Sequence, residues 1–298
     1  MRSEPLVTIG LCVYNGERYV RQSIESLLGQ TFQDFRFIIS DNASTDGTPA
    51  ICQEYAAKDA RIFYTRNELN IGAPSNYNKV AKLTTTKYLK WSTADDYWDS
   101  NFLQRAVTIM ENDPEIALCY PRCTFVDQDG LNPKPYQDFL HLMGDDAGAR
   151  YIHVLEKHQR LHQLLGLKRT AALRKTHLLG TFYGSDLNLT AELSLYGKFY
   201  ELPEPMFFRR FHPQSGAYNQ ASAEHQARYY HGRDTDKPFV EWRKQLWQFR
   251  SALKAPLPLG SKIDVCRQLI QHSIWNREAL FADLFAGIQG KRLHRGGG

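Results

Sequence analysis

LVTIGLCVY, the stretch from Leu6 to Tyr14, is apolar and rich in β-branched and aromatic side chains. Such a run is typical of a buried β-strand. Asn15 and Gly16 end it, and apolar side chains then recur at the spacing of an amphipathic helix: Val20, Ile24, Leu27 and Leu28. The sequence therefore predicts a buried strand followed by an amphipathic helix.

The same alternation continues further along the chain. Four more strand-like segments follow: Phe35 to Ser40, Arg61 to Arg66, Lys87 to Ser92 and Ile116 to Phe125. Helices are expected between them, at about Pro49 to Lys58, at Ser75 to Leu83 and around Leu103 to Met110. The alternation predicts βαβ units, and hence an α/β fold with a mostly parallel sheet flanked by helices on both faces.

Beyond the fifth predicted strand the pattern becomes less regular. The polar segment from Asp127 to Arg150 predicts a loop, and Tyr151 to Leu165 predicts a helix. Phe199 to Phe211 predicts two short strands around its two prolines. Three helical patterns rich in Trp, Leu and Ile follow from Phe239 onward. We therefore expect one α/β domain over residues 1–218 and a basic helical C-terminal extension over residues 219–298.

Charge is unevenly distributed along the 298 residues. The whole chain holds 37 Lys and Arg and 32 Asp and Glu; the segment from Lys237 onward holds 11 and 4 of them, which leaves 26 and 28 before it. The segment thus carries +7 and the rest −2, which predicts an anionic partner for the tail. A membrane surface or lipid-linked acceptor is one interpretation, and packing on the first domain or on a second copy is another. Nucleic acid is not expected, because no recognition motif accompanies the charge.

The composition is that of a globular protein, with 42% hydrophobic and 23% charged residues, so a sizeable core is available. The chain contains no apolar run of about 18 residues, the length that a transmembrane helix needs. No signal peptide is evident, so a cytoplasmic location is expected, with peripheral contact at the inner face of the membrane as an open alternative. The five cysteines, an odd number, argue against a disulfide framework.

Polar clusters follow three of the predicted strands where each one ends. They lie after Tyr14, at Asp41 in DNASTDG, and at Asp95 and Asp96 in WSTADDYW. Ligands of open α/β sheets bind at the carboxyl ends of the strands. The sequence therefore predicts a nucleotide-type site at this edge of the sheet.

The acids in these clusters have both functional and structural interpretations. Asp95 and Asp96 are adjacent carboxylates, which are costly to bury unless they are solvated or bind a cation. Mg²⁺ and Mn²⁺ take carboxylates together with phosphate oxygens, so the pair is a candidate metal site next to a diphosphate; a turn with a helix cap is the alternative. Asp41 is placed to accept a hydrogen bond from a nucleotide base or ribose. The alternative is that it takes part in ordinary turn and capping interactions.

Two later positions also carry candidate chemistry. Asp186 begins a helical stretch and suits either an ordinary cap or a general base aimed into a cleft. Arg210 and His212 fall on one face of a strand by its period of two. The pair is a candidate phosphate-binding site, and His212 is also a candidate metal ligand. The alternative is that both residues simply lie on a solvated strand edge.

The order of these pieces resembles family 2 of the inverting glycosyltransferases, which have a Rossmann-like GT-A fold. The resemblance runs from Pro5 to Ser215. It rests on VTIGLCVYNGERYVRQSIESLLGQT, FRFIISDNASTDGT, the spacing of Asn70, Gly72 and Asn78, WSTADDYW, GLKRTAALRKT, and YGSDLNLTAELSLYGKFYELPEPMFFRRFH. One such stretch would be weakly specific, whereas several in the same order are strongly specific.

The resemblance implies a role for each matching residue. Asp186 would be the catalytic base. Asp95, Asp96 and His212 would hold the metal, Mn²⁺ or Mg²⁺. The nucleotide sugar would be bound by Cys12, Val13, Tyr14, Asn15, Asp41, Asn70, Gly72, Asn78, Thr93, Ala94, Asp95 and Arg210. Asp41 would meet the base, which is uracil in many members of the family.

Two positions depart from the family pattern. Thr93 stands where the family has the first Asp of Asp-x-Asp-Asp, so a hydroxyl there would act on a cation only through water. Ser185 stands where the family has the Glu of a Glu-Asp pair, which leaves Asp186 as the one candidate base.

The resemblance implies an inverting, metal-dependent glycosyltransferase. It would move a hexose-type sugar from a nucleotide sugar, a UDP-sugar above all, to a hydroxyl of a glycan or lipid-linked acceptor. Residues 1–218 would be its nucleotide-sugar-binding and catalytic domain. The basic and aromatic composition of the extension leaves open a peripheral membrane contact or a homodimer through this segment. Two alternatives stay open: a nucleotidyltransferase, although Asn15 to Arg18 match its phosphate loop poorly, and a catalytically impaired nucleotide-sugar-binding module.

Overall fold

Strand β1 (Val7–Val13) lies inside the sheet and is buried along its whole length. The structure is a computed structural model that describes residues 4–136, 140–157, 162–213, 223–232 and 238–289. In it, β1 pairs in parallel with β2 (Phe35–Asp41) on one side and with β4 (Tyr88–Thr93) on the other. The apolar sequence of β1 suits this position because both of its faces are covered.

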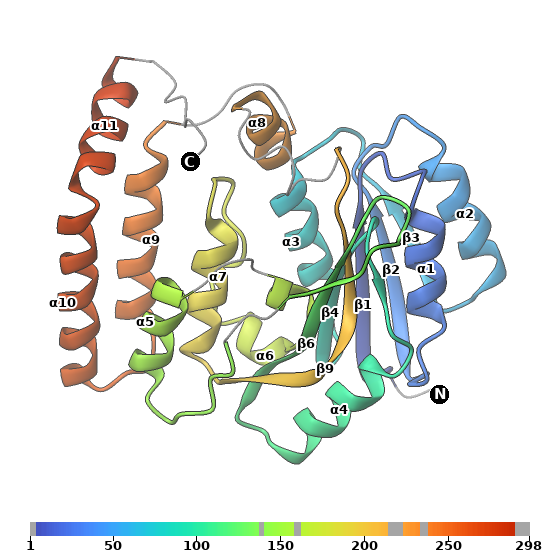
Figure 1. The fold of residues 1–298 in the computed structure, drawn as a ribbon, viewed down its shortest axis with the longest axis horizontal. Coiled ribbons are helices and arrows are strands. Elements are labelled where there is room, and N and C mark those ends of the chain that lie inside the picture. The colour runs from blue at the N-terminus through green and yellow to red at the C-terminus, as the bar shows by residue number, and fades with distance from the viewer. Residues whose placement is uncertain (1–3, 137–139, 158–161, 214–222, 233–237, 290–298) are drawn as a thin grey trace.

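Within the described residues, nine strands form one mixed sheet (Figure 1). Eight follow the order β3-β2-β1-β4-β8-β6-β9-β5, and β7 pairs with β6 beside that path. The other strands are β3 (Ile62–Arg66), β5 (Tyr97–Trp98), β6 (Ile116–Val126), β7 (Lys134–Tyr136), β8 (Leu167–Arg169) and β9 (Lys198–Arg210). The strands from β3 to β4 run parallel, β8 is antiparallel to both of its neighbours, and β6 and β9 are parallel. The two remaining pairings, of β5 with β9 and of β7 with β6, are antiparallel. The predicted α/β class is confirmed, with a mixed sheet whose main parallel part is the N-terminal one.

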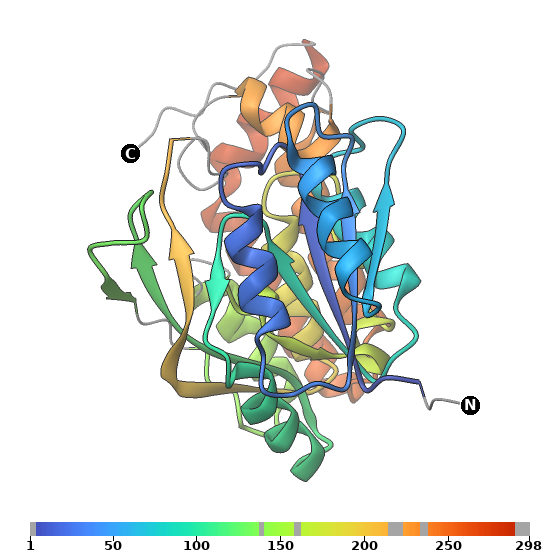
Figure 2. The ribbon, with the colours of Figure 1, turned by 90° about the vertical axis from the view of Figure 1, so that its right-hand side faces the viewer.

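Helices cover both faces of the sheet. Their bounds are α1 (Val20–Leu28), α2 (Thr48–Lys58), α3 (Ala73–Leu83), α4 (Phe102–Asn112), α5 (Ala147–Lys157), the 3₁₀ helix η1 (His162–Leu165), α6 (Thr170–Leu173), α7 (Ser185–Ser194), α8 (Ala223–His231), α9 (Val240–Lys254), α10 (Leu259–Trp275) and α11 (Arg277–Ile288). Helices α1, α2 and α4 pack on one face, and α3, α6 and α7 pack on the other. Figure 2 views the molecule from the side of α1 and α2.

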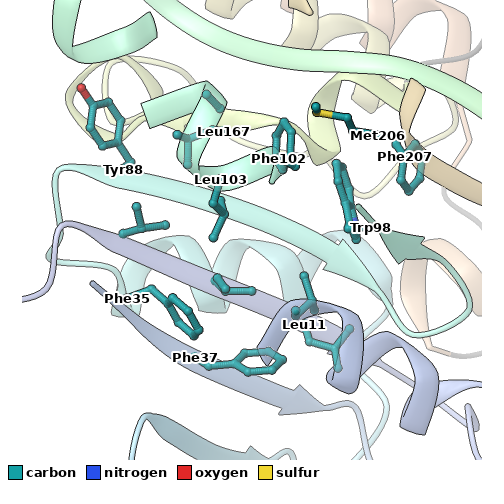
Figure 3. Packing of buried hydrophobic residues seen from close by; sticks show 14 of the residues in the cluster. Leu11, Phe35, Phe37, Tyr88, Trp98, Phe102, Leu103, Leu167, Met206 and Phe207 are labelled. Atoms are coloured by element: carbon teal, nitrogen blue, oxygen red, sulfur yellow. The ribbon is translucent and has the colours of Figure 1, made fainter. Parts of the chain in front are cut away.

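The larger core lies between the sheet and helices α1, α2 and α4. Alternate side chains of β1, including Leu11, point into it and pack with Phe35 and Phe37 of β2 (Figure 3). Aromatic side chains extend this core toward β5 and β9, where the rings of Trp98 and Phe207 stack with 4.4 Å between their centroids. The period of two in the strands thus brings one apolar face of the sheet against the apolar faces of the helices.

The C-terminal helices form a further layer beyond α5 and α7 (Figure 1). Ala252 of α9 and Val265 and Leu269 of α10 are buried in a second core together with apolar side chains of α5 and α7. Helix α11 lies beside α9 and α10. None of the helices in the described residues is long and apolar enough to cross a membrane.

Three expectations for the second half differ from the structure in detail. The predicted loop Asp127 to Arg150 contains β7 and the start of α5, and the helix predicted over Tyr151 to Leu165 is α5 and η1, with residues 158–161 outside the described part. The two short strands predicted over Phe199 to Phe211 are the single strand β9. Its prolines are tolerated because the register with β6 shifts beside them, between Pro121 and Arg122.

Candidate functional site

A cavity of about 130 Å³ opens beside the carboxyl end of β4. Its polar lining comes from five elements that are distant in sequence, and consists of Thr93, His162, Ser185, Asp186, Arg209, Tyr229 and Tyr230. The apolar part of its wall includes Tyr77 of α3 and Trp91 of β4. The structure thus brings two of the predicted site residues, Thr93 and Asp186, to one cavity at the edge of the sheet where ligands are expected.

The turn after β4 is organised around the buried carboxylate of Asp96. One oxygen, Oδ2, accepts a hydrogen bond from the Thr93 hydroxyl at 2.6 Å, and the other accepts one from the backbone N–H of Arg210 at 2.8 Å. Burial, and then the neighbouring charge of Asp95, raise the pKa of Asp96 to about 7. Thr93 therefore supplies a hydroxyl donor where a second carboxylate would repel Asp96.

Asp95 is the acid of this turn that remains partly accessible, and it lies against the buried ring of His212. Oδ2 of Asp95 lies 3.2 Å from Nε2 of His212, and the Asp95 side chain is 30% exposed. The other ring nitrogen of His212, Nδ1, is buried and has no hydrogen-bond partner among the residues that the structure describes. Of the three predicted metal ligands, these two lie together, whereas both oxygens of Asp96 are engaged inside the turn.

The donor set fits a divalent cation that is shared with a substrate. Among the described residues, no three His, Cys, Asp or Glu side chains gather into a complete metal site. Mg²⁺ and Mn²⁺ bind by one or two protein ligands and complete their shell with phosphate oxygens and water. One carboxylate and one imidazole, from Asp95 and His212, match that kind of site.

Arg210 is 4% exposed, and its side chain stabilises the turn after β4. Its guanidinium donates to the carbonyl oxygens of Asp95 and Gln128 at 3.0 and 2.9 Å, and it lies over the ring of Tyr19. The predicted contact of Arg210 with a diphosphate does not fit this arrangement, because its donors are engaged with the protein. Strand alternation turns the preceding residue, Arg209, to the opposite side, where it lines the cavity.

Asp41 at the end of β2 is completely buried. Its Oδ1 accepts from the backbone N–H of Ser44 at 2.9 Å, and its Oδ2 accepts from the Tyr64 hydroxyl at 2.8 Å and from Nε of Arg66 at 3.2 Å. The base of a nucleotide would reach this carboxylate only by displacing the side chain of Arg66 or Tyr64. The neighbouring Tyr14, by contrast, is 49% exposed.

The rest of the predicted nucleotide set lies around β1 and this loop. Cys12, Val13 and Ala94 are buried, and burial raises the pKa of the Cys12 thiol well above its usual range. Asn15 has a left-handed backbone, with a φ of 51°, and its side chain accepts a hydrogen bond from the N–H of Thr45 at 2.8 Å. These contacts fix the loop that follows β1 against the loop that follows β2.

Asn70, Gly72 and Asn78 hold neighbouring segments in place. Asn78 exchanges two hydrogen bonds with the backbone of Leu179, at 2.8 and 3.0 Å. Oδ1 of Asn70 accepts from the side chain of Asn42 and from the backbone N–H of Gly72, at 2.7 and 2.9 Å. The side chains of Asn70 and Asn78 are therefore both engaged with the protein itself.

Two glycines allow helix α8 to approach the loop at Gly72. Gly72 has a φ of 80°, and a Cβ on it would lie 2.5 Å from the carbonyl oxygen of Tyr230. Gly232 has a φ of 68°, and a Cβ on it would lie 2.0 Å from the carbonyl oxygen of Asn70. Both backbones require glycine, for conformation and for space. This close approach places Tyr229 and Tyr230 of α8 at the cavity.

Asp186 lies in the first turn of α7, and the C-terminal layer supports this helix. Asn188 donates to the carbonyl oxygen of Lys244 at 3.1 Å and accepts from the side chain of Gln248 at 3.0 Å. At the other end of α7, the buried Glu192 contacts Nδ1 of His177 at 2.6 Å. The helices of the extension thus pack on the first domain, which is one of the interpretations that the sequence offered, and they support the helix that carries the predicted base.

A family model and two known proteins match the sequence of this chain. The sequence model described as Glycosyl transferase family 2 matches residues 8–179. An uncharacterized glycosyltransferase of Methanocaldococcus jannaschii is 36% identical over 129 residues, which cover 43% of this chain and 44% of the relative. A putative teichuronic acid biosynthesis glycosyltransferase of Bacillus subtilis is 31% identical over 148 residues, covering 48% of this chain and 57% of the relative. The chain thus aligns with about half the length of these relatives.

Solved structures share the fold at low sequence identity. S. aureus TarS, residues 1–349 in complex with UDP, has a TM-score of 0.64 and 16% identity, covering 90% of this chain and 71% of that chain. Pyrobaculum calidifontis mannosyltransferase in complex with GDP-Man and Mn²⁺ has a TM-score of 0.54 and 14% identity, covering 98% and 89%. At these identities the likeness shows the fold.

Proposed function

The chain belongs to glycosyl transferase family 2, and from that premise we propose that it moves a hexose-type sugar from a UDP-sugar to a hydroxyl of a glycan or lipid-linked acceptor, with inversion. The observation that carries the proposal is the cavity in which the carboxylate of Asp186, the guanidinium of Arg209 and the turn at Thr93 meet. A base, a cation and a strand-end turn are the groups that this reaction needs. The complexes of TarS with UDP and with UDP-GlcNAc support a uridine nucleotide.

Each group has a distinct part in a direct displacement. Asp186 takes the proton of the acceptor hydroxyl, while the acceptor oxygen attacks the anomeric carbon from the face opposite the nucleotide. Arg209 stabilises the negative charge that grows on the departing diphosphate. Tyr229 and Tyr230 narrow the cavity and help to exclude water from the reacting atoms.

Asp95 and His212 would hold a Mn²⁺ or Mg²⁺ ion, which would neutralise part of the charge on the diphosphate. The orphaned ring nitrogen of His212 and the 30% exposure of Asp95 support this assignment. Asp96 and Arg210 keep the turn in shape and are assigned positioning roles.

The test is nucleotide release by the purified full chain from a panel of UDP-, GDP- and dTDP-sugars, with Mn²⁺ or with EDTA. We expect release from a UDP-sugar that EDTA abolishes and that Asp186→Asn reduces by about 10²–10⁴-fold, the usual contribution of a general base. Asp264→Asn is the matched control, because this carboxylate is 65% exposed on α10. Equal rates for Asp186→Asn and wild type would refute the assignment of the base.

A nucleotide-sugar-binding module without turnover is the second candidate. It is favoured by Ser185, which stands where the family has a glutamate and whose buried hydroxyl has no hydrogen-bond partner within the described part of the chain. Calorimetric binding of UDP in the presence of Mn²⁺, with no release from any donor even when acceptors are supplied, would select this candidate. Release from any one donor excludes it.

A further inference from the structure

The first turn of α7, which carries Asp186, packs against a lysine of the C-terminal layer. Gly184, two residues before Asp186, has a left-handed backbone with a φ of 82°. A Cβ on Gly184 would lie 3.0 Å from Cε of Lys244 and 3.5 Å from its Nζ. The side chain of Lys244 on α9 therefore lies directly against the turn from which α7 starts.

Lys244 is held in this place by contacts on several sides. Its side chain is 18% exposed, and its Nζ pairs with Oε2 of Glu241, three residues earlier on α9, at 3.1 Å. Its carbonyl oxygen accepts from Asn188 of α7 at 3.1 Å, and Gln248 donates to the same asparagine at 3.0 Å. The backbone N–H of Glu241 donates to Asp283 of α11 at 2.9 Å. The position of Lys244 relative to α7 is thus fixed by both α7 and α11.

The same face of α9 also contacts the segment that leads into α7 (Figure 1). The ring of Trp247 lies 5.3 Å from the rings of His177 and Phe182, measured between centroids. The guanidinium of Arg243 lies 5.0 Å from the ring centroid of Phe182. Residues spaced three or four apart on a helix share one face, so this face of α9 supports the approach to α7 as well as its first turn.

Titratable groups face Asp186 from several elements. Those that line the cavity with it are Arg209 of β9, His162 of η1, and Tyr229 and Tyr230 of α8. Lys244 adds a cation from α9. Burial lowers the pKa of Lys244, and the charges of Tyr183, Asp186 and Asp283 act against that effect. The ammonium of Lys244 and the carboxylate of Asp186 therefore stabilise each other in their charged forms.

We propose that Lys244 is a positioning residue for Asp186, which fixes the first turn of α7 and favours the ionised carboxylate. This inference rests on the proposed role of Asp186 as the base. A carboxylate in a cavity that excludes water tends to keep its proton, and a protonated Asp186 could not accept one from an acceptor hydroxyl. A cation in the supporting layer opposes this, and the ion pair with Glu241 holds that cation in one orientation.

The first test is the pH dependence of kcat/KM for nucleotide release. We expect the midpoint of the acid limb to rise by about one pH unit in Lys244→Met and in Lys244→Gln, because each removes a neighbouring opposite charge. Lys244→Arg keeps the charge and should keep the midpoint. Lys254→Met is the matched control, since this lysine is exposed on the same helix. A purely structural role of Lys244 would lower Tm and leave the midpoint unchanged.

The second test does not depend on turnover. It is a double-mutant cycle of Lys244→Met and Asp186→Asn, followed by urea unfolding at pH 7. We expect the two effects to be non-additive, with a coupling of about tenfold in the unfolding equilibrium constant, as for groups in direct interaction. The control cycle of Lys254→Met and Asp186→Asn should be additive.

The outcomes separate this inference from the proposed reaction. An unchanged midpoint in both neutral variants of Lys244, a shift of the same size in Lys254→Met, or additive effects in the Lys244 cycle would each overturn the role of Lys244. Coupling in the cycle, without nucleotide release from any donor by the wild-type chain, would refute the proposed reaction and uphold the interaction between Lys244 and Asp186.

Discussion

The backbone N–H of Arg210 donates to Oδ1 of Asp96 at 2.8 Å, and this hydrogen bond joins strand β9 to the turn after β4. The two residues are 114 positions apart in sequence. The same contact sets the direction of the neighbouring side chains, because Arg210 must then lie under the turn and Arg209 must face the cavity. His212, two residues further on, meets Asp95.

The two adjacent arginines should therefore respond differently to substitution. Arg209→Gln removes a cavity-lining charge, and we expect nucleotide release to fall by about 10²–10³-fold with little change in Tm. Arg210→Gln removes buried hydrogen bonds to Asp95 and Gln128, and we expect a loss of about 3 kcal/mol in the free energy of unfolding. Thermal unfolding and initial rates of both variants check the pair; a stable, slow Arg210→Gln and an unstable Arg209→Gln would invert the assignment.

Asp96 makes the stability of the metal-free protein depend on pH. The folded protein retains the Asp96 proton up to its pKa of about 7, whereas the unfolded chain loses it near 3.8. The folded state therefore binds more protons in this window, and the free energy of unfolding should fall by up to about 1.4 kcal/mol per pH unit as pH rises through it.

Urea titrations between pH 4.5 and pH 8, with EDTA present, measure this slope. Asp96→Asn should flatten it, and Asp264→Asn should leave it as in wild type. Added Mn²⁺ should stabilise the protein more at pH 8 than at pH 6, because a cation beside Asp95 favours ionised carboxylates. An identical slope in Asp96→Asn and wild type would show that other groups produce the pH dependence.

Gly72 should not tolerate a side chain. Gly72→Ala puts a Cβ 2.5 Å from the carbonyl oxygen of Tyr230 at a φ of 80°, so α8 must move away from the loop. We expect a loss of about 1–3 kcal/mol in stability and a higher KM for the donor, because the tyrosines leave the cavity. Gly260→Ala is the matched control, since a Cβ there has no neighbour within 4 Å and alanine favours the helix. Tm and donor KM that match in the two variants would refute the docking role of Gly72.

Lys90 should be replaceable by an apolar side chain. Its side chain is completely buried, its amine nitrogen lies 3.5 Å from the ring centroid of Trp98, and it donates a hydrogen bond to the carbonyl oxygen of Trp91 at 3.3 Å. Burial, and then the charge of Lys168, lower the pKa of Lys90 well below its usual range.

The folded state therefore favours the neutral amine, and the free energy of unfolding should rise with pH between the lowered pKa and the ordinary value of 10.5. Lys90→Met should be as stable as wild type or more so at pH 7, and its stability should rise less between pH 7 and pH 9. Urea unfolding at the two pH values measures both effects; a variant that is destabilised at pH 7 and keeps the full rise would contradict this account.

The local sequence alone was enough to predict the secondary-structure elements near the N-terminus and the protein family. Long apolar runs such as Leu6 to Tyr14, with amphipathic helices between them, carry their secondary structure in their own periodicity, so β1, β2 and β4 lie close to where they were predicted. The polar residues at the ends of those strands correctly predicted the edge of the sheet at which the site lies, because the carboxyl ends of parallel strands meet at a common edge.

Tertiary structure alone decided which side chains meet. A strand's period of two separates the faces of Arg209 and Arg210 but does not say which face is buried, since this depends on the turn at Asp96, which comes from a distant strand. The short strands β5, β7 and β8 exist because neighbours pair with them, and three residues or fewer carry too little periodicity to be recognised. The two faces of α10 have similar apolar content in sequence, and packing on α5 and α9 buries one row while leaving the other exposed. Patterns along a chain give the faces of each element, and contacts between distant elements decide which of those faces becomes the core, the site or the surface.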